Sequence, residues 1–237
     1  MLAFDALIRD VVDFHDDLVR NVKGFGPPQS PFDDLSASAE DQAVAIAAES
    51  HGQVPSPAPL VTRPFDYGTV VTYPFVPQNW HATRFSDGLA YGVWYGSLDL
   101  KTTVYETVHH WHRFVTDSYP DLDRDIVGER RAFRVRCDAI LIDLRGKERR
   151  ERRLVDRNDY GFTQQLGRYL RDQRQSGLLA VSARWAGRNA AVFRPEVLSD
   201  VRDLCALRYI MNPARDTVRV ERVKGRRWMA VRPSRLR

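Results

Sequence analysis

Short segments of β-forming residues, in no regular alternation with helices, dominate the sequence from Val61 onward. Residue types and spacing predict strands at 70–77, 90–97, 131–144, 178–185, 190–195, 217–223 and 227–233. In this part of the chain, apolar residues follow helical spacing from Ser97 to about Trp111 and over 160–176. This order predicts an α+β domain, a mixed β-sheet core with flanking helices, and argues against a doubly wound parallel sheet.

The first sixty residues follow a different pattern. Residues 2–22 place Phe4, Leu7, Leu18 and other apolar side chains three and four positions apart, which predicts an amphipathic helix. A second helix is expected over 38–50, followed by a proline-stiffened connector over 51–59. We therefore expect an N-terminal helical extension at 1–60 and the main α+β domain at 61–237.

The composition excludes several classes of protein. No apolar run approaches the roughly 18 residues that cross a bilayer, and the N-terminus lacks the pattern of a secretion signal. Cys137 and Cys205 stand far apart, with no metal-ligand spacing around either. We expect a cytoplasmic protein without membrane spans or a disulfide framework, and its net charge of +5 favours anionic partners in general.

Candidate site residues concentrate between Arg84 and Trp111. A guanidinium at Arg84 could hold a pyrophosphate through two parallel hydrogen bonds, and Tyr91 or Tyr95 could contact a ring or a ribose. Glu106 falls off the apolar stripe of its helix, where a carboxylate could stabilise positive charge at an anomeric carbon. Position alone also allows an exposed arginine, core aromatics and a solvated glutamate.

Two other patterns suggest chemistry less strongly. His109, His110 and His112 lack an H-E-x-x-H motif and other ligands at zinc spacing, so we expect no metal site. Ser182 lies outside any G-x-S-x-G motif, which favours a positioning hydroxyl over an acyl-enzyme nucleophile. The run from Arg145 to Arg157 contains seven basic residues mixed with acidic ones, and it could be a solvated loop, a docking patch or a nucleic-acid contact.

An ordered set of residues resembles the RES domain family. The set begins with Arg84-Phe85 and Tyr95-Gly96-Ser97, continues with Glu106 on the next helix, and ends with Gly177 to Ser182, Asn189 and Val192 to Pro195. The resemblance extends over about residues 61–215. It implies a fold similar to that of ADP-ribosyltransferase toxins, with Arg84, Tyr95, Glu106 and Ser182 at the positions of the family's site.

The resemblance also implies an activity and a partner. Proteins of this family are toxins of toxin–antitoxin pairs that consume NAD or transfer its ADP-ribose. NAD would be the substrate, held by Arg84, Tyr91, Tyr95 and Ser97, and the bond between nicotinamide and ribose would be cleaved. The partner would be an antitoxin with a Xre-like helix-turn-helix part, forming a hetero-oligomer in which the toxin itself makes no direct nucleic-acid contact.

The acceptor and the class of function both stay open at the level of sequence. The acceptor of the ADP-ribosyl group could be water, inorganic phosphate or a target protein, the last making the protein an ADP-ribosyltransferase. A different class of function is a non-catalytic basic protein that binds nucleic acid through residues 145–157 and the arginine-rich C-terminus. Such binding would weaken steeply with salt.

Overall fold

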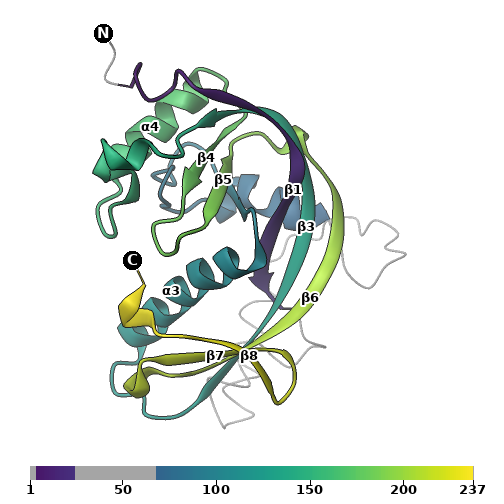
Figure 1. Ribbon diagram of the computed structural model, residues 1–237, viewed down its shortest axis with the longest axis vertical. Helices are drawn as coiled ribbons and strands as arrows, with labels where there is room; N and C mark the ends of the chain where they lie inside the picture. The colour runs from purple at the N-terminus through teal and green to yellow at the C-terminus, as the bar shows by residue number, and fades with distance from the viewer. Residues whose placement is uncertain (1–3, 25–67, 237) are drawn as a thin grey trace.

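One strongly curved sheet organises the molecule in the computed structural model, which describes residues 4–24 and 68–236 (Figure 1). Its strands are β1 (Val11–Lys23), β2 (Trp94–Ser97), β3 (Ile126–Asp143), β4 (Gly177–Val181), β5 (Arg188–Val192), β6 (Leu198–Asn212), β7 (Thr217–Val223) and β8 (Arg226–Val231). The helices are α2 (Gly68–Thr72), α3 (Leu100–Ser118) and α4 (Gly161–Asp172), with several 3₁₀ turns between elements. The predicted mixed α+β class is confirmed.

The strand order is β1-β2-β5-β4-β3-β6-β7-β8, and β1 also pairs with β3. Five strands therefore close into a ring, because β1 contacts β2 at Val19 and Ser97 and runs antiparallel to β3 along its whole length. Among the described strands only β3 and β4 pair in parallel. The ring brings β2, β4 and β5 together above the N-terminal end of α3.

Three apolar clusters hold the helices on this sheet. Val104, Val108 and Val115 of α3 pack against β6, β7 and β8, while Leu166 and Leu170 of α4 pack against β4 and β5. The short helix α2 packs near Trp94, whose indole NH donates to the carbonyl of Val70 at 2.9 Å. The apolar face of each helix thus lies on the sheet.

The N-terminal segment corrects one prediction. Residues 11–23 form β1 rather than part of a helix, and residues 4–9 form turns, in which Phe4 packs on Phe162 and Tyr169. Phe14, Leu18 and Val22 are spaced by four residues, which fits a helix, but they also share one parity and so lie on one face of a strand. The helix expected over 38–50 and the connector over 51–59 lie outside the described residues.

Other elements agree with the sequence to different degrees. The strand expected over 70–77 is wrong, since that segment forms α2 and two 3₁₀ turns around Pro74 and Pro77. The strand expected over 90–97 begins only at Trp94. The helices near 97–111 and 160–176, the strands around 131–144, 178–185 and 190–195, and the C-terminal hairpin are confirmed, whereas β6 is not predicted.

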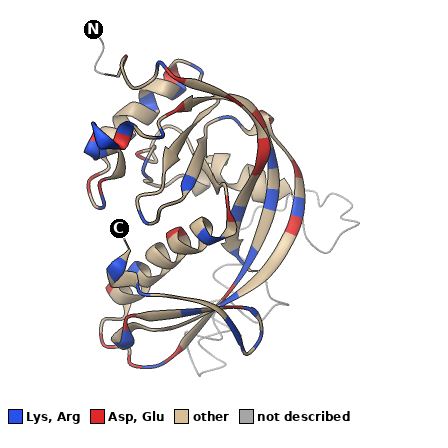
Figure 2. Ribbon diagram, viewed as in Figure 1, with Lys and Arg blue, Asp and Glu red and all other residues tan. Residues whose placement is uncertain are grey.

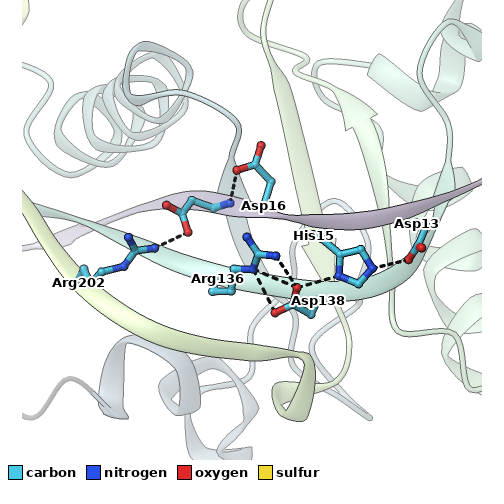
Figure 3. Close-up of polar contacts among 7 residues, drawn as sticks. Asp13, His15, Asp16, Arg136, Asp138 and Arg202 are labelled. Atoms are coloured by element: carbon cyan, nitrogen blue, oxygen red, sulfur yellow. Dashed lines mark hydrogen bonds and ion pairs between the residues drawn. The ribbon is translucent and has the colours of Figure 1, made fainter.

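Charge pairs within and between strands lie on the exposed side of β1, β3 and β6 (Figure 3). His15 lies between Asp13, at 2.7 Å, and its register partner Asp138, at 2.8 Å. The hydrogen bond with Asp138 raises the pKa of His15. Arg136 binds the same Asp138 carboxylate at 2.9 Å. The His15–Asp138 contact joins β1 to β3 and so supports their pairing, whereas the Asp13–His15 and Arg136–Asp138 contacts each lie within one strand.

The basic run after β3 forms two short 3₁₀ helices, Lys147–Arg149 and Arg152–Val155. Several of its charges are engaged within the chain: Arg145 binds Asp143 at 2.6 Å, Arg153 binds Glu151 at 2.6 Å, and Lys147 binds Asp10 at 3.0 Å. Figure 2 shows this mixture of basic and acidic residues. The segment therefore anchors the N-terminus, which reduces the charge it can offer to a polyanion.

None of the described helices is both long enough and apolar enough to cross a membrane. Both cysteines are free thiols.

Candidate active site

Glu106 is the centre of a hydrogen-bonded cluster built by α3, β2, β5 and the turn after β4. Its Oε1 accepts hydrogen bonds from the hydroxyl of Ser182 at 2.6 Å and from the side-chain amide of Asn189 at 2.7 Å. The other carboxylate oxygen makes no hydrogen bond to a residue that the structure describes. One oxygen of Glu106 is thus held in place by the side chains of Ser182 and Asn189.

The sheet places the partners of Glu106 by register. Ser97 of β2 stands opposite Asn189 of β5, and its hydroxyl donates to the Asn189 side-chain oxygen at 2.6 Å. Since the amide oxygen of Asn189 accepts from Ser97, its NH₂ group is directed at Glu106. Ser97 therefore orients Asn189, and Asn189 orients the carboxylate.

Backbone amides of the β4–β5 turn fix Ser182. The NH groups of Arg184 and Trp185 both donate to its hydroxyl oxygen at 3.0 Å, so the hydroxyl proton is free to bind Glu106. Ser182 is only 3% exposed. These contacts suit a positioning hydroxyl, because its lone pairs are already occupied.

A close approach locks this turn onto α3. Asp99 caps α3 by accepting from the backbone NH of Thr102 at 2.8 Å and from its hydroxyl at 2.6 Å. A Cβ at Gly187 would lie 1.8 Å from Thr102 Oγ1. Only glycine allows the turn to come this close, so Gly187 sets the distance between Ser182 and Glu106.

Arg84 is held close to this cluster by aromatic and backbone contacts. Its guanidinium lies 4.5 Å from the centre of the Tyr160 ring and donates to the carbonyl of Leu154 at 3.3 Å. Burial lowers the pKa of Arg84, and the positive charge of Arg184 acts in the same direction, whereas Tyr160 and Glu106 oppose the shift. Arg184 is itself buried and donates to Tyr160 Oη at 2.9 Å.

The two candidate tyrosines support the Arg84 segment from opposite sides. Tyr95 Oη accepts from the backbone NH of Phe85 at 3.0 Å and donates to Thr83 at 3.0 Å, and burial raises its pKa to about 12. Tyr91 Oη donates to the carbonyl of Phe85 at 2.7 Å. Tyr91 lies in the core against Phe193, with 6% of its surface exposed, so it is not brought to Glu106.

The structure thus joins Glu106, Ser182 and Ser97 by hydrogen bonds, with Asn189 between them. Arg84 lies close enough to both Glu106 and Tyr95 that each of them raises its pKa, against the larger effect of burial. Sequence reasoning did not assign a site role to Asn189, Arg184 or Tyr160, although Asn189 belongs to the ordered set that resembles the family; its pairing with Ser97 across β2 and β5 gives it that role. Among the described residues, no three His, Cys, Asp or Glu side chains form a group that could hold a metal ion.

Comparison with known proteins places the chain in a family. No curated protein matches the sequence. A similar solved structure is the crystal structure of the M. tuberculosis MbcT–MbcA toxin–antitoxin complex, with a TM-score of 0.47, 10% sequence identity, and coverage of 86% of this chain and 88% of that chain. The RES domain model matches residues 60–212, which is more than half of the 237 residues. The chain therefore belongs to the RES domain family.

Proposed function

We propose that this protein is the toxin of a toxin–antitoxin pair and that it cleaves the nicotinamide–ribose bond of NAD. The observation that carries the proposal is the Glu106 carboxylate, fixed through one oxygen by Ser182 and Asn189 next to the half-buried Arg84 and the buried Arg184. Membership of the RES domain family supports it. A preorganised carboxylate beside an anion-binding arginine suits a substrate that carries both a diphosphate and a ribose.

The proposed reaction requires an oriented substrate and electrostatic stabilisation of its transition state rather than a strong acid. Nicotinamide leaves as a neutral molecule from a cationic ring, and positive charge develops on the ribose in the transition state. Glu106 stabilises that charge, and its second oxygen can orient a ribose hydroxyl. Arg84 binds the diphosphate, Tyr95 holds the Arg84 segment and contacts the nicotinamide half, and Ser97 and Ser182 keep the ribose and Glu106 in place.

The test measures nicotinamide release from NAD by purified protein, in buffer and with inorganic phosphate. Glu106→Gln keeps the size of the side chain but removes its charge, and we expect the rate to fall by about 10²–10³-fold. Arg84→Lys keeps the charge but loses the planar fork, so we expect a higher KM for NAD. Asp117→Asn is the control, because Asp117 is an exposed carboxylate on the same helix.

The product identifies the acceptor. ADP-ribose indicates hydrolysis, its 1-phosphate indicates phosphorolysis, and modified protein in the presence of a cell extract indicates ADP-ribosyl transfer. A Glu106→Gln variant that turns over at the wild-type rate would rule out the mechanism. Absence of nicotinamide release under all three conditions would rule out the proposed activity.

The proposed partner is an antitoxin with a Xre-like helix-turn-helix part that forms a hetero-oligomer with this chain in the cytoplasm. Expression of the chain should arrest growth, and co-expression of the adjacent gene product should restore it and co-purify with the chain. Growth arrest by the Glu106→Gln variant equal to that by the wild type would separate toxicity from NAD cleavage.

A further inference from the structure

A pocket lies beside the Glu106 cluster, lined by residues of α3, the β4–β5 turn and the C-terminal segment 226–236, which includes β8. It has a volume of about 530 Å³ and is lined by Tyr105, Trp185 and four arginines, namely Arg184, Arg227, Arg232 and Arg235. Three of these arginines come from beyond residue 212, where the match to the family model ends. The pocket therefore combines the family's site with an element that the family model does not include.

The arginines of the C-terminal segment give this pocket an unbalanced positive charge. Arg227, Arg232 and Arg235 are exposed, and none of them forms an ion pair with a carboxylate in the described part of the chain. The nearby Asp216 accepts from the backbone NH of Ser234 at 2.9 Å and from its hydroxyl. Clustered guanidinium groups without acidic partners bind anions, and phosphate in particular.

The wall of the pocket offers an aromatic surface. The Trp185 indole stacks on the Tyr105 ring, with centroids 4.0 Å apart and planes inclined by 13°. Tyr105 covers one face of the indole, yet Trp185 remains 39% exposed. The exposed indole surface can therefore receive a second flat ring, and stacking of a base on an aromatic side chain contributes favourably to nucleotide binding.

From these three features we infer that the pocket binds a nucleoside phosphate, with its base on Trp185 and its phosphate on the arginines of the C-terminal segment. The volume is that of a small-ligand site, suited to one nucleotide rather than a strand. The ligand is either a free nucleotide or the far half of a dinucleotide substrate. Because the NH of Trp185 donates to Ser182, a ligand on this wall contacts the turn that holds the Glu106 cluster.

The binding test uses the full-length protein, with AMP, adenosine and inorganic phosphate titrated separately by calorimetry. AMP should bind at least about 10-fold more tightly than either adenosine or phosphate, since it alone makes both contacts. Arg232→Ala, Arg235→Ala and Trp185→Leu should each weaken AMP binding by about 10-fold. Arg226→Ala is the matched control, because Arg226 is an exposed arginine of the same hairpin that does not line the pocket.

Several results would overturn the inference. AMP binding no tighter than phosphate binding would show that Trp185 does not bind the base. A loss of AMP affinity in Arg226→Ala equal to that in the pocket variants would show that the arginines act only through the overall positive charge. A single-stranded hexanucleotide that binds more than about 100-fold tighter than AMP, with a steep salt dependence, would assign the surface to a nucleic-acid strand instead. Unchanged thermal unfolding of each variant shows that the fold is intact.

A competition experiment between AMP and NAD, which rests on the proposed function, identifies the source of the nucleotide. If AMP inhibits nicotinamide release competitively with NAD, the pocket holds the adenylate half of the substrate. If AMP changes the rate without competing, the pocket holds a separate nucleotide. The calorimetric arm needs no turnover, so its failure is distinguishable from failure of NAD cleavage.

Discussion

The close contact between Gly187 and Thr102 allows a prediction with a calculable displacement. In Gly187→Ala the new Cβ would lie 1.8 Å from Thr102 Oγ1 and 2.8 Å from its Cβ and Cγ2. Thr102 is fully buried and its hydroxyl is bound to Asp99, so it cannot rotate away. Because non-bonded atoms approach to about 3.5 Å, the turn has to withdraw from α3 by roughly 1.5–2 Å.

That displacement breaks the Glu106 cluster. The 2.6 Å bond between Ser182 and Glu106 would lengthen beyond hydrogen-bonding distance, and the Ser182 amide, which donates to the Gly187 carbonyl at 2.9 Å, would follow the turn. We expect nicotinamide release to fall about 100-fold, as for other misplacements of about 1 Å. Overpacking should also lower the free energy of unfolding by about 1–3 kcal/mol.

The assay combines nicotinamide release with denaturant unfolding and includes two further variants. Gly146→Ala places a Cβ in open space but at φ +84°, so it should cost about 1 kcal/mol of stability without loss of activity. Thr102→Ala removes the closest atom, and combined with Gly187→Ala it should restore part of the activity that Gly187→Ala loses. Wild-type activity in Gly187→Ala would show that the turn does not set the geometry of the site.

Two further predictions follow from the same contacts. Asn189→Ala should reduce the rate of nicotinamide release more than Ser97→Ala does, because Asn189 binds Glu106 directly and Ser97 acts only through Asn189. Equal rates in the two variants would contradict a direct role of Asn189 in orienting Glu106. Burial lowers the pKa of His109 to about 3, so between that value and its ordinary pKa of 6.5 the unfolded chain binds a proton that the folded chain does not. Stability should therefore fall as pH drops from 7 to 4, and urea unfolding of His109→Gln should show a smaller fall.

An element is predictable from the local sequence where the spacing of its apolar residues fits only one kind of secondary structure. The helix carrying Glu106 was predictable because Leu100, Val104, Val108 and Trp111 repeat at a spacing that fits a helix and not the alternation of a strand. The spacing of Phe14, Leu18 and Val22 fits both a helix and a strand, and the choice is made by pairing with β3, which no local pattern contains. Similarly, β6 is fixed by its neighbours β3 and β7, and its register shifts interrupt the alternation that would reveal it.

The candidate site divides in the same way. Arg84, Glu106 and Ser182 could be selected because each belongs to the ordered set that resembles the family. Asn189 belongs to the same set, but its role in orienting Glu106 comes from its pairing with Ser97, which depends on how β2 and β5 align in space. The arginine pocket was not predictable, because it needs the hairpin to return the C-terminus to α3.

The N-terminal strand belongs to the structure that supports the site. The guanidinium of Arg20 in β1 donates to the carbonyl of Tyr95 at 2.8 Å and lies 5.3 Å from the centre of the Trp94 ring. Burial lowers its pKa to about 10, so its charge is retained at neutral pH. Since β1 also pairs with β3 along its whole length, it joins the strand that carries Tyr95 to the centre of the sheet. Residues 11–23 thus help to hold Tyr95, and through it the Arg84 segment, in place.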